Sequence, residues 1–296
     1  MPNLLPALII GALWCGSTVL AALPWVYWSD PSQRGEQLVL LACAPPIFIL
    51  SFVTLAGLLS IPAQRGIVRG KFPRQAFHPV YFLRRVYGAC WTTIYYFKPL
   101  YSAVLAIPVL RRWTLFLFGY RGASQFTVYP DTWIRDLPLL KIGQGSYLSN
   151  RATIGTNLCL SDGQIYVDEV HFGEKVLVGH LAKVAPGSRM AAEAEIGVGA
   201  SVGIRCKVGP KTKVGVNASL NHGAVMEEGA EIGTASYVGL KAQIGPGVKI
   251  AAGGSIPAGA VIATQSEANK YFSSEQSALL SERDRVAQML RLMETA

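Results

Sequence analysis

The residues best suited to acid–base chemistry are four histidines: His78, His171, His180 and His222. An imidazole is the usual general base near neutral pH, where it can take a proton from a hydroxyl or an amine that attacks a carbonyl group. His78 lies in the segment FHPV beside long apolar stretches, which indicates a position at a membrane interface. His180 and His222 are better candidates, because both occupy the same place in a repeat that runs through the later part of the chain.

This repeat has a period of six residues. Every sixth residue from Ile142 to Ile256 is apolar, over twenty consecutive positions. The fifth residue of most hexads is small or β-branched, and the residue after the apolar one is Gly in eleven hexads. We expect these glycines to supply unusual backbone angles at recurring corners. His180 and His222 are both third residues of their hexads, so their side chains should point outward near a corner.

The pattern of an aliphatic residue, Gly, two variable residues, a small residue and a variable one resembles the hexapeptide-repeat family. The resemblance covers residues 142–261 and implies a left-handed parallel β-helix of six to seven coils, with three hexads in each coil. The fold class is therefore mainly β. Most members are acyl-CoA-dependent acyltransferases that form homotrimers and react in grooves between neighbouring subunits. The resemblance implies acetyl-CoA or another acyl-CoA as co-substrate here, and a His as general base.

Two histidines are similar to the catalytic His of the family. His180 stands in VGHLAKVAP and His222 in LNHGAVM, and either could instead be an outward residue with a structural role at a subunit interface. We favour His222, because its hexads are regular and Asn217 and Asn221 offer nearby amide partners. Asp162 could orient His180 if the repeat holds, since it would then lie one coil below. The two histidines could share a groove, or one could be active and the other structural.

Other residues complete the predicted site. The resemblance places the CoA phosphates near basic side chains of the last coils, for which Lys241 and Lys249 are candidates. The stretch 157–171 departs from the repeat and is a candidate acceptor loop. No spacing of histidines fits the zinc site of β-helical carbonic anhydrases, so we expect no metal. The five cysteines are odd in number and indicate a reduced compartment, with Cys206 serving packing.

The first part of the chain is predicted to enter a membrane. Hydrophobic residues make up 51% of the chain and charged residues only 15%, and the mean hydropathy is +0.32. Residues 3–28 and 38–61 are uncharged and each is long enough to cross a bilayer core of about 30 Å. We therefore predict a transmembrane hairpin over 1–62. An ordinary cytosolic enzyme and a disordered chain are both disfavoured.

The net charge of +9 comes from one band. Residues 37–130 contain ten basic residues and neither Asp nor Glu. The positive-inside rule then places the β-helix in the cytoplasm, at a bacterial inner membrane. Residues 63–130 are predicted to be basic amphipathic helices against anionic lipid headgroups, and the apolar segment 86–110 could instead be re-entrant. The aromatic residues of the band are mixed with aliphatic ones, which disfavours nucleic-acid binding.

The domain plan continues with the β-helix over 131–265 and a C-terminal helix over 266–296, with a capping box at Ser273–Gln276. Residues 111–149 are also similar to membrane-bound hexapeptide domains fused to peptide synthetases. We hypothesise a membrane-anchored O- or N-acyltransferase that acts on a lipid-linked glycan, a lipid headgroup or an envelope precursor. The alternatives are aminoacyl or peptidyl transfer in peptide synthesis, and a trimeric membrane scaffold without turnover.

Overall fold

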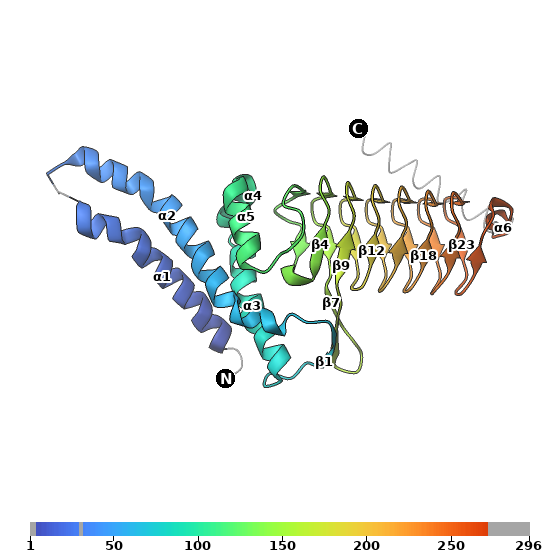
Figure 1. Cartoon of the computed structure of the whole chain (residues 1–296), viewed down its shortest axis with the longest axis horizontal. Helices are drawn as coiled ribbons and strands as arrows, with labels where there is room; N and C mark the ends of the chain where they lie inside the picture. The colour runs from blue at the N-terminus through green and yellow to red at the C-terminus, as the bar shows by residue number, and fades with distance from the viewer. Residues whose placement is uncertain (1–3, 30–31, 272–296) are drawn as a thin grey trace, which may run out of the picture. The chain divides into compact units, whose positions relative to one another are not determined.

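The computed structural model describes residues 4–29 and 32–271, which divide into two units (Figure 1). The helical unit contains the described part of Met1–Arg121 together with Arg135–Leu139 and Cys159–Tyr166. The coiled unit contains Gly122–Ile134, Leu140–Leu158 and the described residues from Val167 onward. The chain therefore passes back and forth between the two units before it continues into the later coils.

Two long apolar helices open the helical unit. They are α1 (Leu4–Trp28) and α2 (Arg34–Ser60), and both are long and apolar enough to cross a membrane. The two helices pack against each other, and the ring of Trp14 lies 5.6 Å from that of Phe48 and 5.4 Å from that of Phe52. The predicted pair of apolar helices is confirmed, and α2 continues as a helix through both of its prolines.

Three shorter helices follow, and proline determines where they start. A 3-10 turn, η1 (Pro62–Gly66), and strand β1 (Gly70–Pro73) lead to α3 (Pro79–Tyr96), α4 (Lys98–Ala106) and α5 (Pro108–Leu117). Each helix has a proline in its first turn, where the missing N–H costs nothing. The α4 and α5 axes are bent by 110° at Ile107, which is the geometry of a broken span or a re-entrant loop.

A buried ion pair joins α3 to the short helical-unit segment that includes η2 (Leu137–Leu139). Arg84 Nη2 donates to Asp136 Oδ2 at 2.5 Å, and both side chains are buried. The Tyr87 hydroxyl accepts the backbone N–H of Leu137 at 3.2 Å. Breaking a buried pair by removing one partner costs about 3–5 kcal/mol, because it leaves an uncompensated charge. Segment 135–139 is therefore firmly attached to the helices.

The coiled unit is a parallel β-helix with three faces of seven strands each. The first face contains β2 (Thr127–Val128), β5 (Tyr147–Leu148), β10 (Leu177–Val178), β13 (Glu195–Ile196), β16 (Lys213–Val214), β19 (Glu231–Ile232) and β22 (Lys249–Ile250). The second face contains β3 (Trp133–Ile134), β6 (Thr153–Ile154), β11 (Lys183–Val184), β14 (Ser201–Val202), β17 (Ser219–Leu220), β20 (Tyr237–Val238) and β23 (Ser255–Ile256). The third face contains β4 (Leu140–Ile142), β9 (Val170–Phe172), β12 (Arg189–Met190), β15 (Lys207–Val208), β18 (Val225–Met226), β21 (Gln243–Ile244) and β24 (Val261–Ile262).

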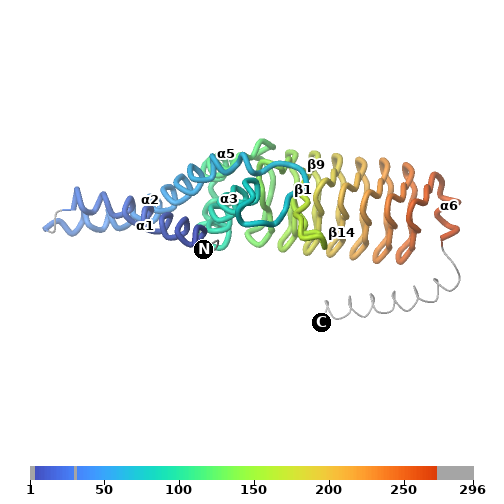
Figure 2. The backbone as a smooth tube through the Cα atoms, turned by 90° about the horizontal axis from the view of Figure 1, so that it is seen from below, coloured from blue at the N-terminus to red at the C-terminus, as the bar shows by residue number. Residues whose placement is uncertain are grey.

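The predicted β-helix is confirmed, and its coils follow one another as a regular stack (Figure 2). In each strand the last residue points inward and is buried, as Val202 and Ile232 show. The small fifth residue of the hexad is also fully buried, for example Ala200 and Ala242. The repeat thus makes a dry interior in which large and small side chains alternate along the chain.

Two residues of the six-residue series lie outside the coils. Leu160 and Tyr166 belong to an excursion that contains β7 (Asn157–Cys159) and β8 (Gln164–Val167). These strands join β1 in a three-stranded sheet with the order β1-β8-β7, and the Gly163 carbonyl accepts the N–H of Arg74 at 3.3 Å. The excursion adds a multiple of six residues to the chain. The apolar residues on both sides of it therefore stay in one six-residue series, and this series alone does not reveal the excursion.

The role predicted for the repeated glycines is wrong. Positive φ angles occur two residues later in the hexad, as at Gly199 (φ 66°) and Leu181 (φ 58°). The glycines after the apolar residues face the next coil at close range. A Cβ added to Gly197 would lie 2.7 Å from the Val214 carbonyl oxygen, closer than real Cβ contacts. Close approach of backbones, and not backbone angle, is therefore what excludes larger residues there.

The described chain ends with a short capped helix, α6 (Gln265–Asn269). Its N-cap Thr264 forms a capping box with Glu267. The capping box predicted at Ser273–Gln276, with most of the predicted C-terminal helix, lies outside the described residues.

The dry interior leads to a first prediction. Ala242→Leu should lower the free energy of unfolding by about 1–3 kcal/mol, because the larger side chain has no room between coils. Gln243→Leu places the same side chain at the next residue, which points outward on β21, and should change stability by no more than about 0.5 kcal/mol. Urea unfolding of the detergent-solubilised protein measures both, and equal effects would contradict the assignment of inward and outward positions.

Candidate active site

A groove of about 370 Å³ lies along the edge where the second face turns into the third face. Its floor is a column of outward side chains on successive second-face strands: Thr153, Lys183, Ser201 and Ser219. The Ser201 hydroxyl donates to that of Ser219 at 3.1 Å. The turn at Asn221 and His222 and the start of the excursion also line the groove. We call this feature the edge groove.

His222 is held in the edge groove by backbone groups on both sides. Its Nδ1 accepts the N–H of Ile204, one coil earlier, at 2.9 Å. Its own carbonyl accepts the N–H of Lys241, one coil later, at 3.0 Å. The repeat produces this arrangement, since residues 18 apart stack on one another in these coils. The ring position therefore depends on the stacking of three coils.

The hydrogen bond from Ile204 decides which ring nitrogen of His222 carries a proton. An Nδ1 that accepts an N–H has no proton of its own, so the neutral ring is protonated at Nε2. Among the described residues no group is bonded to Nε2 of His222. The ring is thus arranged to donate an Nε2–H to a ligand. Acting as a base would require the other tautomer and the loss of the bond from Ile204.

Asn221 supports this turn through both ends of its amide. Its Oδ1 accepts the backbone N–H of His222 at 2.8 Å, and its Nδ2 donates to the Tyr237 hydroxyl at 2.7 Å. The thiol of Cys206 donates to the Asn221 carbonyl at 3.0 Å. Burial raises the pKa of Cys206 to about 11, so the thiol is protonated at neutral pH. Cys206 therefore serves packing, as expected, and is not a nucleophile.

His180 lies on a different edge, where the first face turns into the second. It follows β10, and its carbonyl accepts the N–H of Gly199 at 2.8 Å. Among the described residues we find no hydrogen bond to its ring. The residue stacked one coil below is Asn150, whose carbonyl accepts the N–H of Leu181. One chain therefore does not bring His180 and His222 together.

Asp162 and Asn217 are placed by their own turns. Asp162 lies in the turn of the excursion, where its Oδ1 accepts the N–H of Gln164 at 2.9 Å. The continuous register assumed for Asp162 below His180 is interrupted there, and Asn150 occupies that position. Asn217 lies before β17, whereas His222 lies after it. Its φ of 53° is a conformation that asparagine tolerates well, so the backbone of the turn explains why asparagine stands at this position.

The two lysines predicted for CoA binding are separated. Lys241 lies on the same edge as His222, one coil later, and its side chain is exposed. Lys249 lies on the first face, where its Nζ forms an ion pair with Glu231 at 3.1 Å. Only Lys241 is positioned to contact a ligand that extends from the edge groove along the coils.

A cationic column lies on the third face. Lys141, His171 and Arg189 are outward residues of adjacent strands in direct register. Partial burial, together with the charges of Lys141 and Arg189, lowers the pKa of His171 despite the opposing effect of Glu169. His171 is therefore biased toward its neutral form.

Sequence reasoning missed several polar residues of the site, among them Lys183, Ser201, Ser219 and Tyr237. Each stands directly before an inward apolar residue, a position that the family motif leaves variable. Reading the chain in steps of 18 residues from Lys183 would have placed them in one column, because three hexads make one coil.

Of three comparisons with known proteins, only the one with solved structures found matches. No family model and no curated protein matches the chain. WeeI from Acinetobacter baumannii AYE matches 40% of the chain with a TM-score of 0.32 and 21% identity. The acetyltransferase domain of PglB from Neisseria gonorrhoeae matches 48% with a TM-score of 0.35 and 20% identity. A UDP-N-acetylglucosamine acyltransferase from Francisella novicida matches 53% with a TM-score of 0.41 and 15% identity.

The matched part spans 56% of WeeI, 62% of the PglB domain and 71% of the Francisella protein. At this level of similarity the chemistry of this chain has to be argued from its own residues.

The cationic column gives a second prediction. His171 should titrate below the ordinary value for histidine, about 6.5, and Lys141→Gln should raise its pKa by removing a nearby positive charge. The corresponding contribution to stability is present above pH about 6.5 and is lost as the pH falls through the lower pKa of the folded state. NMR titration of the imidazole measures this, with Lys213→Gln on the first face as control. A pKa unmoved by Lys141→Gln would contradict the prediction.

Proposed function

We propose that this chain is a membrane-anchored acyltransferase that moves an acyl group from acyl-CoA to a hydroxyl or an amine in the edge groove. The observation that carries the proposal is His222, which lines the edge groove and whose Nδ1 is occupied by the Ile204 N–H, so that its Nε2–H is the donor left for a ligand. The six-residue repeat, with its resemblance to acyl-CoA-dependent enzymes, supports the same reaction class. Fold alone would not, since one fold hosts many activities.

The proposed reaction needs two catalytic functions from the protein: stabilisation of the oxyanion and removal of the acceptor proton. The acceptor oxygen or nitrogen attacks the thioester carbonyl carbon, the carbonyl oxygen gains negative charge, and the carbon–sulfur bond then breaks to release the CoA thiolate. A donor aimed at the developing oxyanion stabilises the transition state, and loss of one such donor costs about 10²–10³ in rate. We assign this role to the Nε2–H of His222.

The second function is removal of the acceptor proton by a general base. This proton would finally be transferred to the departing CoA thiolate. His180 is the candidate, because its ring has no hydrogen bond among the described residues. His180 and His222 lie on opposite edges of the second face, so one groove contains both only if two copies of the chain each contribute one. A homotrimer with grooves between its subunits satisfies this requirement. The other possibility is that His180 has a structural role.

The remaining parts of the proposal concern binding. Lys241 would contact phosphates of CoA, because it extends the edge of His222 by one coil. The apolar helices α1 and α2 would hold the enzyme at the cytoplasmic face of a bacterial inner membrane. Confinement to the membrane raises the effective concentration of a lipid-linked acceptor near the groove.

Amide replacements of His222 test its role. His222→Gln keeps an N–H donor near the position of Nε2, whereas His222→Asn keeps only the acceptor for Ile204. We expect His222→Asn to lower kcat about 10²–10³-fold and His222→Gln to lower it clearly less. Release of CoA thiol by the detergent-solubilised protein, with candidate sugar or lipid acceptors, provides the measurement.

Equal losses in both variants, together with disappearance of the acid limb of the rate–pH profile, would show that His222 is the base instead. Full turnover in both would refute a catalytic role for His222. No turnover or acyl-CoA binding by the wild-type protein would favour a scaffold.

Mixed oligomers test the shared groove. Neither His180→Ala nor His222→Ala should be active alone. Mixed trimers of the two co-expressed variants should regain about a third of the wild-type rate, because one of the three grooves in every mixed cyclic trimer contains both histidines. Activity is measured on complexes purified through a different tag on each variant. Absence of recovery in verified mixed trimers would contradict a groove built from both histidines.

A further inference from the structure

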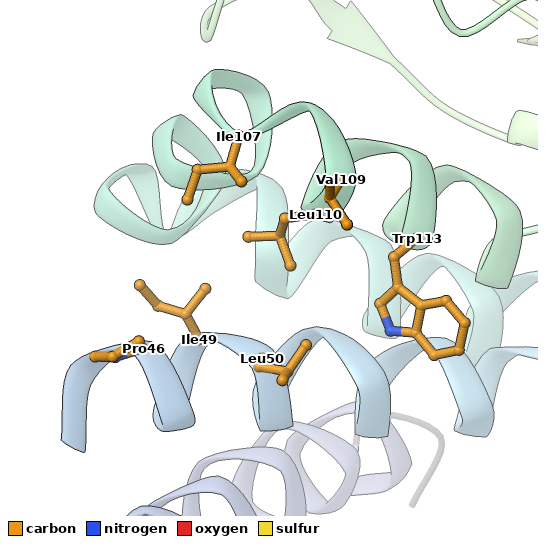
Figure 3. Close-up of a pocket in the computed structure, with 7 residues that line it drawn as sticks. All are labelled: Pro46, Ile49, Leu50, Ile107, Val109, Leu110 and Trp113. Atoms are coloured by element: carbon orange, nitrogen blue, oxygen red, sulfur yellow. The ribbon is translucent and has the colours of Figure 1, made fainter. Parts of the chain in front are cut away.

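An apolar pocket of about 440 Å³ lies between α2 and the bend that joins α4 to α5 (Figure 3). Its seven lining residues are all uncharged: Pro46, Ile49, Leu50, Ile107, Val109, Leu110 and Trp113. Figure 3 shows the side chains of α2 and those of the bend facing a common space. The volume falls within the range of about 300–1,000 Å³ that is usual for small-molecule sites.

Two features place α5 beside α2 at the pocket. Pro108 cannot continue α4, so the chain turns by 110° and α5 lies along α2. The indole N–H of Trp113 donates to the Thr54 hydroxyl at 3.0 Å, which connects α5 to α2 at one side of the pocket. The bend and the hydrogen bond thus fix the position of α5 relative to α2 beside the pocket.

The position and exposure of the pocket indicate that it faces lipid. Its α2 residues lie in the middle of a helix long enough to cross a membrane. Leu50 is 54% exposed and Val109 77% exposed. Open apolar surface of this kind marks a site for an apolar partner. In a bilayer that partner is a hydrocarbon chain.

Two arginines next to the pocket are suited to bind the headgroup of such a lipid. Arg111 and Arg112 directly follow the pocket residue Leu110 on α5. Arg112 is exposed and lies three positions after Val109, which places both on the same side of the helix. Because residues 37–130 contain neither Asp nor Glu, no carboxylate of this segment would repel a phosphate there. Arginine also suits phosphate oxygens through paired hydrogen bonds.

We propose that this pocket binds one hydrocarbon chain of a membrane lipid whose phosphate headgroup is bound by Arg112 and Arg111. The apolar pocket selects the chain, and the arginines select lipids that carry a phosphate over neutral ones. That this lipid is also the carrier of the acyl acceptor rests on the proposed function. The binding itself does not depend on turnover.

Photolabelling tests the proposal on the full-length protein in lipid vesicles. The probe is a trace of phosphatidylglycerol with a diazirine in one acyl chain, and labelled peptides are mapped by mass spectrometry. We expect labels to concentrate on the peptides that contain Leu50 and Val109. Leu50→Trp should fill the pocket and lower this labelling about tenfold, equivalent to about 1.4 kcal/mol. Leu41→Trp is the matched control, because Leu41 is an exposed residue of the same helix outside the pocket.

The headgroup is tested with Arg112→Gln and with a diacylglycerol that carries the same diazirine. Arg112→Gln should lower labelling by the phosphate lipid several-fold and leave labelling by the neutral lipid unchanged. Lys71→Gln, at an exposed lysine outside the pocket, should affect neither.

Three results would overturn the proposal: uniform labelling along α1 and α2, no response to Leu50→Trp, or equal capture of both lipids by the wild-type protein. Release of CoA thiol, measured on the same samples, separates the two proposals. Specific labelling without turnover contradicts only the proposed function, and turnover without specific labelling contradicts only the lipid site.

Discussion

The coiled unit depends on one interaction, the parallel hydrogen bonds that join each coil to the next. From β9 to β21 each strand pairs with the strand 18 residues later, as Val178 pairs with Ile196 and Ile196 with Val214. The strand spacing of about 4.8 Å leaves no room between backbones at the corners. The glycines that follow many of the apolar residues and the small residues inside both result from this spacing. So does the chemistry on the surface, because equivalent residues of successive coils must stack.

The edge groove is a result of this stacking. The hydroxyls of Ser201 and Ser219 meet because their strands are neighbours. The same stacking brings the Ile204 amide to one side of His222 and the Lys241 amide to the other. The Ile204 amide, at a position where amides otherwise only join coils, thus also selects the tautomer of His222. A site of this kind needs no loop to build it, only a polar residue where the hexad tolerates one.

Much of the fold is predictable from the sequence, because few architectures besides a β-helix require an apolar residue at every sixth position. The two apolar helices are equally clear from length and charge. The stretch 157–171 is visibly irregular, but the pairing of its strands with β1 is not predictable, since that contact joins segments distant in the sequence. The same holds for Arg84 and Asp136.

The candidate site is less predictable, because its chemistry depends on register. Asn221 stands out as an amide partner of His222 from the sequence alone. The donor role of His222 depends on one backbone N–H, from Ile204, that no residue type reveals. Lys249 and Lys241 look alike in sequence, and only the register shows that Glu231 faces Lys249.

The chain alternates between its two units, and this restricts how the protein can be cut into domains and how recombination can exchange them. The carboxylate of Asp136 belongs to the segment 135–139, yet its arginine comes from α3. Strands β7 and β8 have their sheet partner in β1, far earlier in the sequence. A cut placed before the first coil would leave a buried carboxylate without its cation and a hairpin without its neighbour. The β-helix is therefore not a module that recombination could move alone, and the helices and coils are expected to have been gained, lost and exchanged together.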